Sequence, residues 1–430
     1  MTSTEPTHTF QRILRHASHL AMLLLLLLCW GCGEGQEKDG KVRLVLSVPA
    51  DQKTRGMYRG MVEDFQKTHP NVEIQILEIP GNYYSKVLVM IAGRNAPDLM
   101  WMGQSFAEFA SRGVFLDLTS RIKEGVSVEE FLPQALSWYC LDGRQYGVPF
   151  GIDMNYILYN RKLFDEAGVA YPTDDWTYDE FLEKAQALTI DLDGDGSPEQ
   201  YGFRGGLEKA SFGAAVISAD GTKPLCNSPE MIRFLQTGLD LAEKWKVAPP
   251  PDDSDVESLD TYAYFQQEKA AMMTMFTWNL PFLRSKCADM NWDIVNMPTV
   301  ERRGHWASSQ AILVSKDTKH PDEAWELCKL FFGDGIQHIM AARGLPSNLR
   351  VAREHMATYT GNPRNWRALY KARDSLHPTP RIPNLSEIMS LYYSASSGVT
   401  AHRATPAEAM DKAEKAINFY LKRKRRNKRD

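Results

Sequence analysis

Between residues 42 and 102, short apolar segments alternate with amphipathic ones, and this alternation constrains the fold more than any other feature. Residues 42–48 are apolar and β-branched, and residues 71–76 alternate apolar with polar side chains, so both segments are expected to be strands. Residues 58–65 and 83–92 carry apolar side chains at helical spacing, and a further strand is expected at 97–102. Strands that alternate with helices predict an α/β fold with a mostly parallel sheet.

Local signals mark several helix ends. Gly93 is expected to stop the second of these helices. Ser105 and Thr177 each precede a glutamate by three residues, which is the spacing of a capping box. Ser228 followed by Pro229 has the pattern of an N-cap and a first helical position.

The length of the chain predicts more than one domain. At 430 residues it exceeds the ~250–300 residues that a single hydrophobic core usually reaches. Residues 143–160 read as the passage between two domains, because a polar turn leads through a short apolar crossing into a strand. The bend is expected at Tyr146–Pro149, with Asp153 just past it.

A ligand site is expected where strands of the first domain end. Ligands of open α/β sheets bind beyond the carboxyl ends of the strands. Asp98, Trp101 and the loop at 49–51 are therefore candidates, although core packing is the alternative for Trp101. Tyr83 and Tyr84 follow a turn at a helix start, and one of the two is expected to be exposed.

The N-terminus has the pattern of an export signal. Basic residues precede an apolar run that includes six leucines, Leu23–Leu28, and the run is shorter than the ~20 residues of a membrane-spanning helix. The stretch from Cys29 to Cys32 resembles a bacterial lipoprotein signal, with residues 1–31 removed, Cys32 acylated and 32–40 as a linker. Trp30 departs from that pattern, and an ordinary secretory signal is the alternative.

The remaining cysteines and the charge exclude some classes of function. Cys328 lies in a helical pattern and is expected to be a buried free thiol, whereas the pairing of Cys140, Cys226 and Cys287 stays open. A net charge of −4 gives no pull toward nucleic acid. The basic residues at 422–430 are expected to form a disordered, solvated tail, with weak contact to anionic lipid headgroups as a further reading.

One loop has the start of a calcium-binding pattern. Asp191, Asp193 and Asp195 occupy loop positions 1, 3 and 5, and Glu199 supplies an acceptor at position 9. Position 12 is Gly202 instead of the bidentate glutamate. A structural calcium site and an acidic surface turn are both compatible with this loop, and no other cofactor is expected.

Four blocks of sequence resemble one protein family in their order and spacing. Residues 84–98, 143–160, 162–169 and 176–181 are similar to the extracellular solute-binding proteins of bacterial ABC importers, in the sugar-binding, maltose-binding-protein-like branch. The resemblance implies a two-lobed periplasmic-binding-protein fold of class II type, in which each lobe is a mostly parallel sheet flanked by helices. It assigns 41–149 and about 308–352 to the N-lobe, and 150–307 and about 353–421 to the C-lobe.

The same resemblance points to residues of a cleft between the lobes. The segment 265–279 is similar to a family segment whose tryptophan commonly lines the cleft, and the stretch 304–309 is similar to the second passage between lobes. Aromatic faces stack on the C–H faces of sugar rings. The expected ligand-binding residues are Trp278, Asp153, Trp101, Trp306, Asp98, Tyr83, Tyr84 and Asn279, with Ser308 beside them.

The resemblance implies a binding protein and not an enzyme. A lipid-anchored monomer, exported to the periplasm or to the outer face of the membrane, is expected to close on a sugar and present it to an ABC permease. The same fold with a polyamine, peptide or anion as its cargo is the alternative. An exported glycan-active enzyme is the third hypothesis, but no nucleophile elbow, metal motif or phosphate loop accompanies Asp98 and Asp153.

Overall fold

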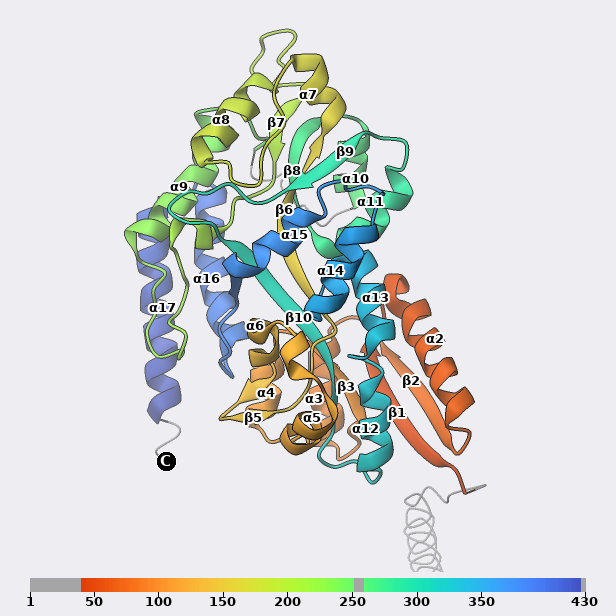
Figure 1. Ribbon diagram of the computed structural model, residues 1–430. Helices are drawn as coiled ribbons and strands as arrows, with labels where there is room; N and C mark the ends of the chain where they lie inside the picture. Colours follow the sequence, from red (N-terminus) through yellow and green to blue (C-terminus); the bar gives the residue numbers. More distant parts are fainter. Residues whose placement is uncertain (1–39, 251–258, 427–430) are drawn as a thin grey trace, which may run out of the picture.

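Two long strands join two α/β lobes in the computed structural model, which describes residues 40–250 and 259–426 (Figure 1). The strands are β6 (Gly151–Asn160) and β10 (His305–Val314), and they lie antiparallel in the middle of the molecule, with Ser308 opposite Asp153. Between them they pair with strands of both lobes. The predicted passages at 143–160 and 304–309 therefore lie side by side.

The N-lobe is built on parallel strands. β1 (Val42–Pro49) pairs in parallel with both β2 (Val72–Ile79) and β3 (Leu99–Met102), and the last residues of β10 add an antiparallel strand beside β3. Its helices are α2 (Gln52–Thr68), α3 (Tyr83–Ala92), α4 (Phe106–Ser111), α5 (Thr119–Gly125), α6 (Pro133–Ser137), α12 (Pro321–Lys329) and α13 (Asp334–Arg343).

The C-lobe sheet is mixed, and the expectation of a mostly parallel sheet is wrong there. β7 (Tyr201–Arg204) and β8 (Ala270–Phe276) are parallel, but β6 is antiparallel to both β8 and β9 (Trp292–Val295). The reason is that β6 enters this lobe from the crossing, whereas β8 and β9 run back toward it.

Eleven α-helices of the described chain follow β6. They are α7 (Arg161–Ala167), α8 (Tyr178–Ala187), α9 (Pro229–Glu243), α10 (Leu259–Gln266), α11 (Leu280–Lys286), α14 (Leu349–Thr358), α15 (Arg367–Ala372), α16 (Leu385–Thr400) and α17 (Pro406–Arg426), in addition to the N-lobe helices α12 and α13. Two short strands, β11 (Leu345–Pro346) and β12 (Leu376–Pro378), pair with the starts of β6 and β10. The long helices α16 and α17 pack on each other at the edge of the C-lobe.

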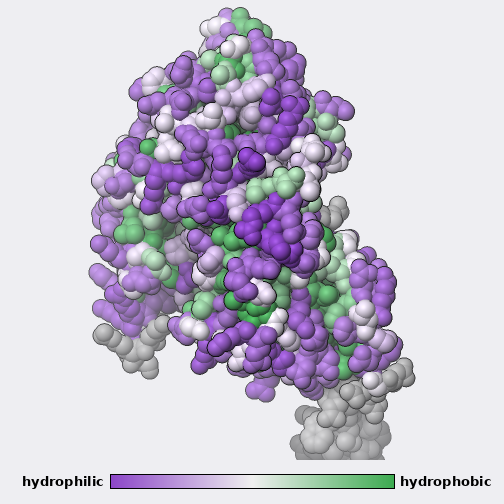
Figure 2. All heavy atoms as spheres, in the orientation of Figure 1, coloured by the Kyte–Doolittle hydropathy of each residue, from purple (hydrophilic) through white to green (hydrophobic). Residues whose placement is uncertain are grey.

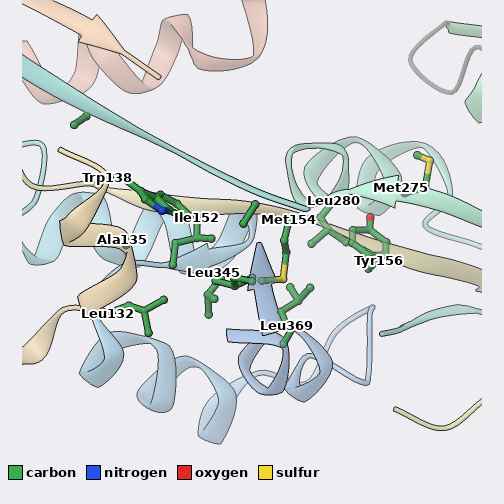
Figure 3. Packing of buried hydrophobic residues seen from close by; sticks show 14 of the residues in the cluster. Leu132, Ala135, Trp138, Ile152, Met154, Tyr156, Met275, Leu280, Leu345 and Leu369 are labelled. Atoms are coloured by element: carbon green, nitrogen blue, oxygen red, sulfur yellow. The ribbon is translucent and has the colours of Figure 1, made fainter. Parts of the chain in front are cut away.

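Alternate side chains of β6 have different environments. Ile152, Met154 and Tyr156 pack in one core that runs from the N-lobe into the C-lobe. Figure 3 shows N-lobe side chains, among them Trp138, at one end of this core and Leu280 at the other. Of the intervening residues, Asp153 faces the cavity described below, whereas Ile157 and Tyr159 pack in a separate core of the C-lobe. The outer surface is mostly hydrophilic in the view of Figure 2.

Most of the predicted helix ends are observed. Gly93 caps α3, and the Thr177 hydroxyl and Glu180 carboxylate form a capping box at the start of α8. Ser228 accepts the N–H of Met231 at the start of α9. Ser105 makes no side-chain cap bond, so the capping box predicted there is wrong.

The predictions for the cysteines and for the two ends of the chain can also be compared with the structure. Cys140, Cys226, Cys287 and Cys328 are all free, and Cys328 is buried in α12 as predicted. The disordered tail is wrong for Lys422–Arg426, because α17 continues through them. The export signal and Cys32 lie outside the described residues, among which no helix is long and apolar enough to cross a membrane.

Candidate functional site

A cavity of about 1130 Å³ lies between the lobes, and the crossing strands form its floor. Because strand side chains alternate, Asp153 of β6 and Trp306, Ser308 and Gln310 of β10 all point into it. The hinge that joins the lobes therefore also supplies binding groups.

Asp153 is the most buried acidic group on this floor, with 7% of its surface exposed. Thr277 Oγ1 donates a hydrogen bond to its carboxylate at 3.2 Å, and Gln310 Nε2 donates another. Burial raises the pKa of Asp153, while these two hydrogen bonds and the charge of Arg343 act in the opposite direction. The structure therefore places Asp153 as an oriented acceptor in the cavity, as the sequence predicted.

Three aromatic rings form the C-lobe wall of the cavity. β8 ends at Phe276, and the short 3₁₀ helix Thr277–Asn279 follows it and carries Trp278. The Phe276 and Trp278 rings are stacked with centroids 4.4 Å apart, and Trp306 meets both of them edge-on. Trp278 and Trp306 line the cavity, which agrees with their predicted positions.

A second aromatic wall belongs to the N-lobe. Trp101 from β3 and Tyr84 from α3 line the cavity with ring centroids 6.0 Å apart. The backbone N–H of Gly103 donates to Tyr84 Oη at 3.2 Å, and burial raises the pKa of Tyr84 to about 12. Tyr84 is therefore a neutral phenol fixed beside the cavity, and core packing alone does not describe Trp101.

Three predicted ligand residues do not line the cavity. Asp98 precedes β3 and so lies at its amino end, where its carboxylate accepts the N–H of Val45 and the hydroxyl of Thr318. Tyr83 is the buried member of the tyrosine pair, and its hydroxyl bonds to Ser47. Asn279 is buried and donates to Tyr262 Oη at 2.7 Å. All three predictions are wrong, because these polar atoms serve the protein interior.

Glu208 is a cavity residue that the sequence did not reveal. It lies before the short 3₁₀ helix Lys209–Phe212 and is 8% exposed. Asn155 of β6 donates to its carboxylate at 3.2 Å and accepts the backbone N–H of Trp306 at 3.0 Å. This network ties the C-lobe wall to both crossing strands.

Other lining residues come from segments far apart in the chain. The loop at 49–51, which was expected near a site, contributes Asp51. The rest of the charged lining was not predicted and consists of Glu108, Lys209, Arg302 and Arg343, with His377 beside them. Carboxylates and cations are thus mixed around the cavity, which suits a neutral ligand that carries many hydroxyl groups.

The acidic loop brings three of its four predicted calcium ligands together. Carboxylate oxygens of Asp191, Asp193 and Asp195 lie within 4.8 Å of one another and are exposed, whereas Glu199 accepts the N–H of Leu192. A Cβ on Gly202 would lie 1.8 Å from the carbonyl oxygen of Ala185, so no glutamate fits at position 12. A calcium ion here would need water to complete its coordination, and the site stays a prediction.

Comparison with known proteins assigns the family. The sequence model of the bacterial extracellular solute-binding proteins matches residues 50–338. The chain belongs to this family. Among its relatives, a putative binding protein of Brucella abortus is 24% identical over 89% of this chain and 94% of the relative. The galactooligosaccharide-binding protein of Bacillus subtilis is 22% identical over 95% and 97% of the two chains.

Solved structures of such binding proteins share the fold. An ABC substrate-binding protein from Listeria monocytogenes in complex with cycloalternan superimposes with a TM-score of 0.77 at 25% identity, over 89% of this chain and 99% of the other. A maltose/maltodextrin-binding domain from Bdellovibrio bacteriovorus bound to maltotriose gives a TM-score of 0.73 at 20% identity, over 89% and 100%. The two-lobed architecture is therefore that of this solute-binding protein family.

Proposed function

We propose that this solute-binding protein binds an oligosaccharide between its lobes and delivers it to the permease of an ABC importer. The observation that carries the proposal is the pair of aromatic walls, Trp278 with Trp306 and Trp101 with Tyr84, on opposite lobes of one cavity. Aromatic faces cover the apolar faces of sugar rings, and polar groups between them bind hydroxyls.

The size of the cavity favours several sugar units over one. Its volume of about 1130 Å³ slightly exceeds the ~300–1,000 Å³ that small-molecule sites usually have. The relatives from Bacillus subtilis and Listeria monocytogenes, named for a galactooligosaccharide and solved with cycloalternan, support the same class of ligand.

The other cargoes fit this lining less well. A polyamine would be favoured by carboxylates without nearby cations, and an anion by cations or helix N-termini without carboxylates. Here Asp153 and Glu208 share the cavity with Arg302 and Arg343. The relatives are named as binding proteins, which supports binding and delivery over turnover of a glycan.

In this mechanism the ligand holds the two lobes together. A ligand that touches both aromatic walls is bound more tightly when the lobes are close, so binding shifts the population toward the closed state. Export across the membrane, with acylation at Cys32 as the anchor, would keep the protein beside its permease.

A thermal-shift screen tests the proposed cargo. Mono- and oligosaccharides, putrescine and inorganic phosphate would each be added to the purified protein, because a ligand of the native state raises the Tm by mass action. We expect an oligosaccharide to raise the Tm the most. A rise with putrescine or phosphate and none with any sugar would overturn the proposal.

Substitution of Trp278 tests whether the aromatic walls bind the sugar. Trp278→Ala removes apolar contact worth about 1–3 kcal/mol, so we expect the Kd of the best oligosaccharide to rise about 5–150-fold in calorimetry. Trp245 is the matched control, because it is also half-buried in the C-lobe but does not line the cavity. If Trp245→Ala weakens binding as much as Trp278→Ala, the wall is not where the sugar binds.

A further inference from the structure

The last turn of α17 carries a dense positive charge. Lys422, Arg423, Lys424, Arg425 and Arg426 are consecutive and all exposed, and we call them the basic tip. Without these five charges the net charge of the chain would be −9 instead of −4. The positive charge of the tip thus contrasts with the net negative charge of the rest of the chain.

The fold of α17 does not require this charge. The helix buries Ala409, Met410, Ala413, Ile417 and Leu421, so its last core contact precedes the basic tip. One or two cations suffice to interact with a helix C-terminus, and five neighbours repel one another. Because these cations repel one another and do not contribute to the core, we infer that they have a function other than packing.

Few acidic groups of the described chain lie along the helix near the basic tip. From Lys415 to Arg426 the helix has no Asp or Glu, and the acids before them are engaged, Glu414 with Asn227 and Asp411 with Lys415. Among residues 40–250 and 259–426 no ion pair is recorded between a member of the tip and a carboxylate. Arg425 donates to the carbonyl oxygen of Thr222 at 2.9 Å.

The loop that accepts the hydrogen bond from Arg425 contains two charged residues close to Thr222. It adds the exposed cation Lys223. It also carries Asp220, whose carboxylate is occupied by hydrogen bonds from Ser218 and Thr222. The hydrogen bond to Thr222 joins Arg425 to this loop, and the helical backbone of α17 continues through the tip.

The position of the tip suits a membrane surface. In Figure 1 the end of α17 and the start of β1 both lie toward the lower end of the molecule, on its left and right sides. Cys32 precedes Val42 by ten residues, so a lipid anchor there would hold this end near the bilayer. Phe419, one turn before the tip, is 70% exposed and offers an apolar group to the same surface. The orientation rests on the proposed acylation, whereas the charge of the tip does not.

We propose that the basic tip binds the anionic headgroups of a phospholipid bilayer and forms a second membrane contact beside the anchor. Guanidinium groups donate paired hydrogen bonds to phosphate oxygens, and clusters of four to eight cations bind anionic bilayers. A second contact of this kind would add to the attachment that the lipid anchor provides and lengthen the residence of the protein at the membrane.

Vesicle binding without the anchor tests this proposal. The processed protein carrying Cys32→Ser would be mixed with vesicles of phosphatidylcholine alone or with phosphatidylglycerol, and floated on a density gradient. We expect binding only to the vesicles with phosphatidylglycerol, and a decrease as salt screens the charges. Absence of binding at low salt would overturn the proposal.

A charge-matched pair of variants isolates the tip. Lys422, Arg423, Lys424 and Arg426 would be exchanged for Gln, with Arg425 kept for its bond to Thr222. The control exchanges four exposed C-lobe lysines for Gln, which are Lys162, Lys244, Lys246 and Lys269. We expect the tip variant to lose at least tenfold in vesicle partitioning and the control to bind as the parent does. Equal loss in both variants would overturn the proposal.

Two further arms distinguish the kind of anion. Inorganic phosphate is expected not to compete with vesicles, because a single phosphate engages too few of the five cations. Duplex DNA that binds as tightly as the vesicles would assign the tip to nucleic acid and overturn the proposal. Oligosaccharide binding by the tip variant should be unchanged. Vesicle binding therefore tests this proposal, and oligosaccharide binding separately tests the proposed function.

Discussion

The carboxylate of Asp153 is mostly buried but lines the cavity. Its removal should therefore weaken ligand binding without lowering the stability of the protein. Asp153→Asn removes a charged acceptor worth about 1.5–3 kcal/mol, so the Kd for the oligosaccharide should rise at least tenfold. Burial raises the folded pKa of Asp153, so its contribution to stability is full below the unfolded pKa and is lost as the pH rises through the folded pKa. At neutral pH the Tm of the variant should therefore be retained or raised.

Calorimetry and thermal unfolding at neutral pH check the two effects together. Asp98 is the matched control, because its carboxylate accepts two hydrogen bonds away from the cavity. Asp98→Asn should cost about 1–3 kcal/mol of stability and leave the Kd unchanged. An unchanged Kd in Asp153→Asn would instead make Asp153 part of the scaffold.

At the scale of elements, signals that act within a few residues predicted the structure well. The bounds expected for the helix at 83–92 are those of α3, and the capping box at Thr177 forms, because both depend on neighbouring residues. The same pattern at Ser105 fails, since that helix enters from a turn with φ −80° and ψ 4° and not from extended backbone. Asp98 was misplaced because the strand begins one residue after it, which alternation alone did not indicate.

Whether the acidic loop binds calcium can be decided by measuring the thermal stability of the protein. Three like charges within 4.8 Å repel one another, and a bound cation would relieve that repulsion. We expect calcium to raise the Tm by a few degrees, about 1 kcal/mol of added stability. Asp193→Asn should remove this dependence on calcium.

Asp220→Asn is the control for the acidic loop, because Asp220 is an exposed turn aspartate bonded to Ser218 and Thr222. It should leave the response to calcium intact. A Tm of the parent protein that is the same in calcium and in chelator would show that the loop is an acidic turn only.

Arg381 forms a contact between elements of the two lobes. It precedes α16 of the C-lobe, and its guanidinium lies 5.5–5.9 Å from the ring centroids of Phe106, Trp138 and Tyr139 in the N-lobe. Its Nη1 donates to the carbonyl oxygen of Ser137 at 3.1 Å. Burial lowers the pKa of Arg381, because desolvation disfavours the cation, and the aromatic faces offset part of this cost.

Arg381→Ala should therefore loosen the lobes without touching the large cavity, which Arg381 does not line. We expect a several-fold rise in Kd and a larger radius of gyration of the unliganded protein, since the lobes are less often positioned for closure. Arg233→Ala is the control, because Arg233 lies over Phe212 within the C-lobe alone. An equal effect of both exchanges would refute a role between the lobes.

At the scale of the whole molecule, the cavity could be predicted only in part. Asp153 and Trp306 were predicted because the order of sequence blocks indicates the two crossings, and Trp278 because 265–279 resembles a family segment whose tryptophan lines the cleft. Glu208 and Arg343 were not, since each lies in a segment whose position relative to β6 depends on the packing of both lobes. The alternation of β6 and β10 would have identified Gln310, had the register of the two strands been known.

Closure of the lobes is the prediction that involves the entire chain. If both aromatic walls contact one oligosaccharide, saturating ligand should reduce the radius of gyration in solution scattering by about 1 Å, from about 22 Å for a chain of 430 residues. Trp278→Ala, measured at equal saturation, should close less, because its C-lobe wall contributes less differential affinity for the closed state. A radius that stays constant while the ligand binds would mean that β6 and β10 are a rigid support, and that the cavity accepts its ligand without a hinge.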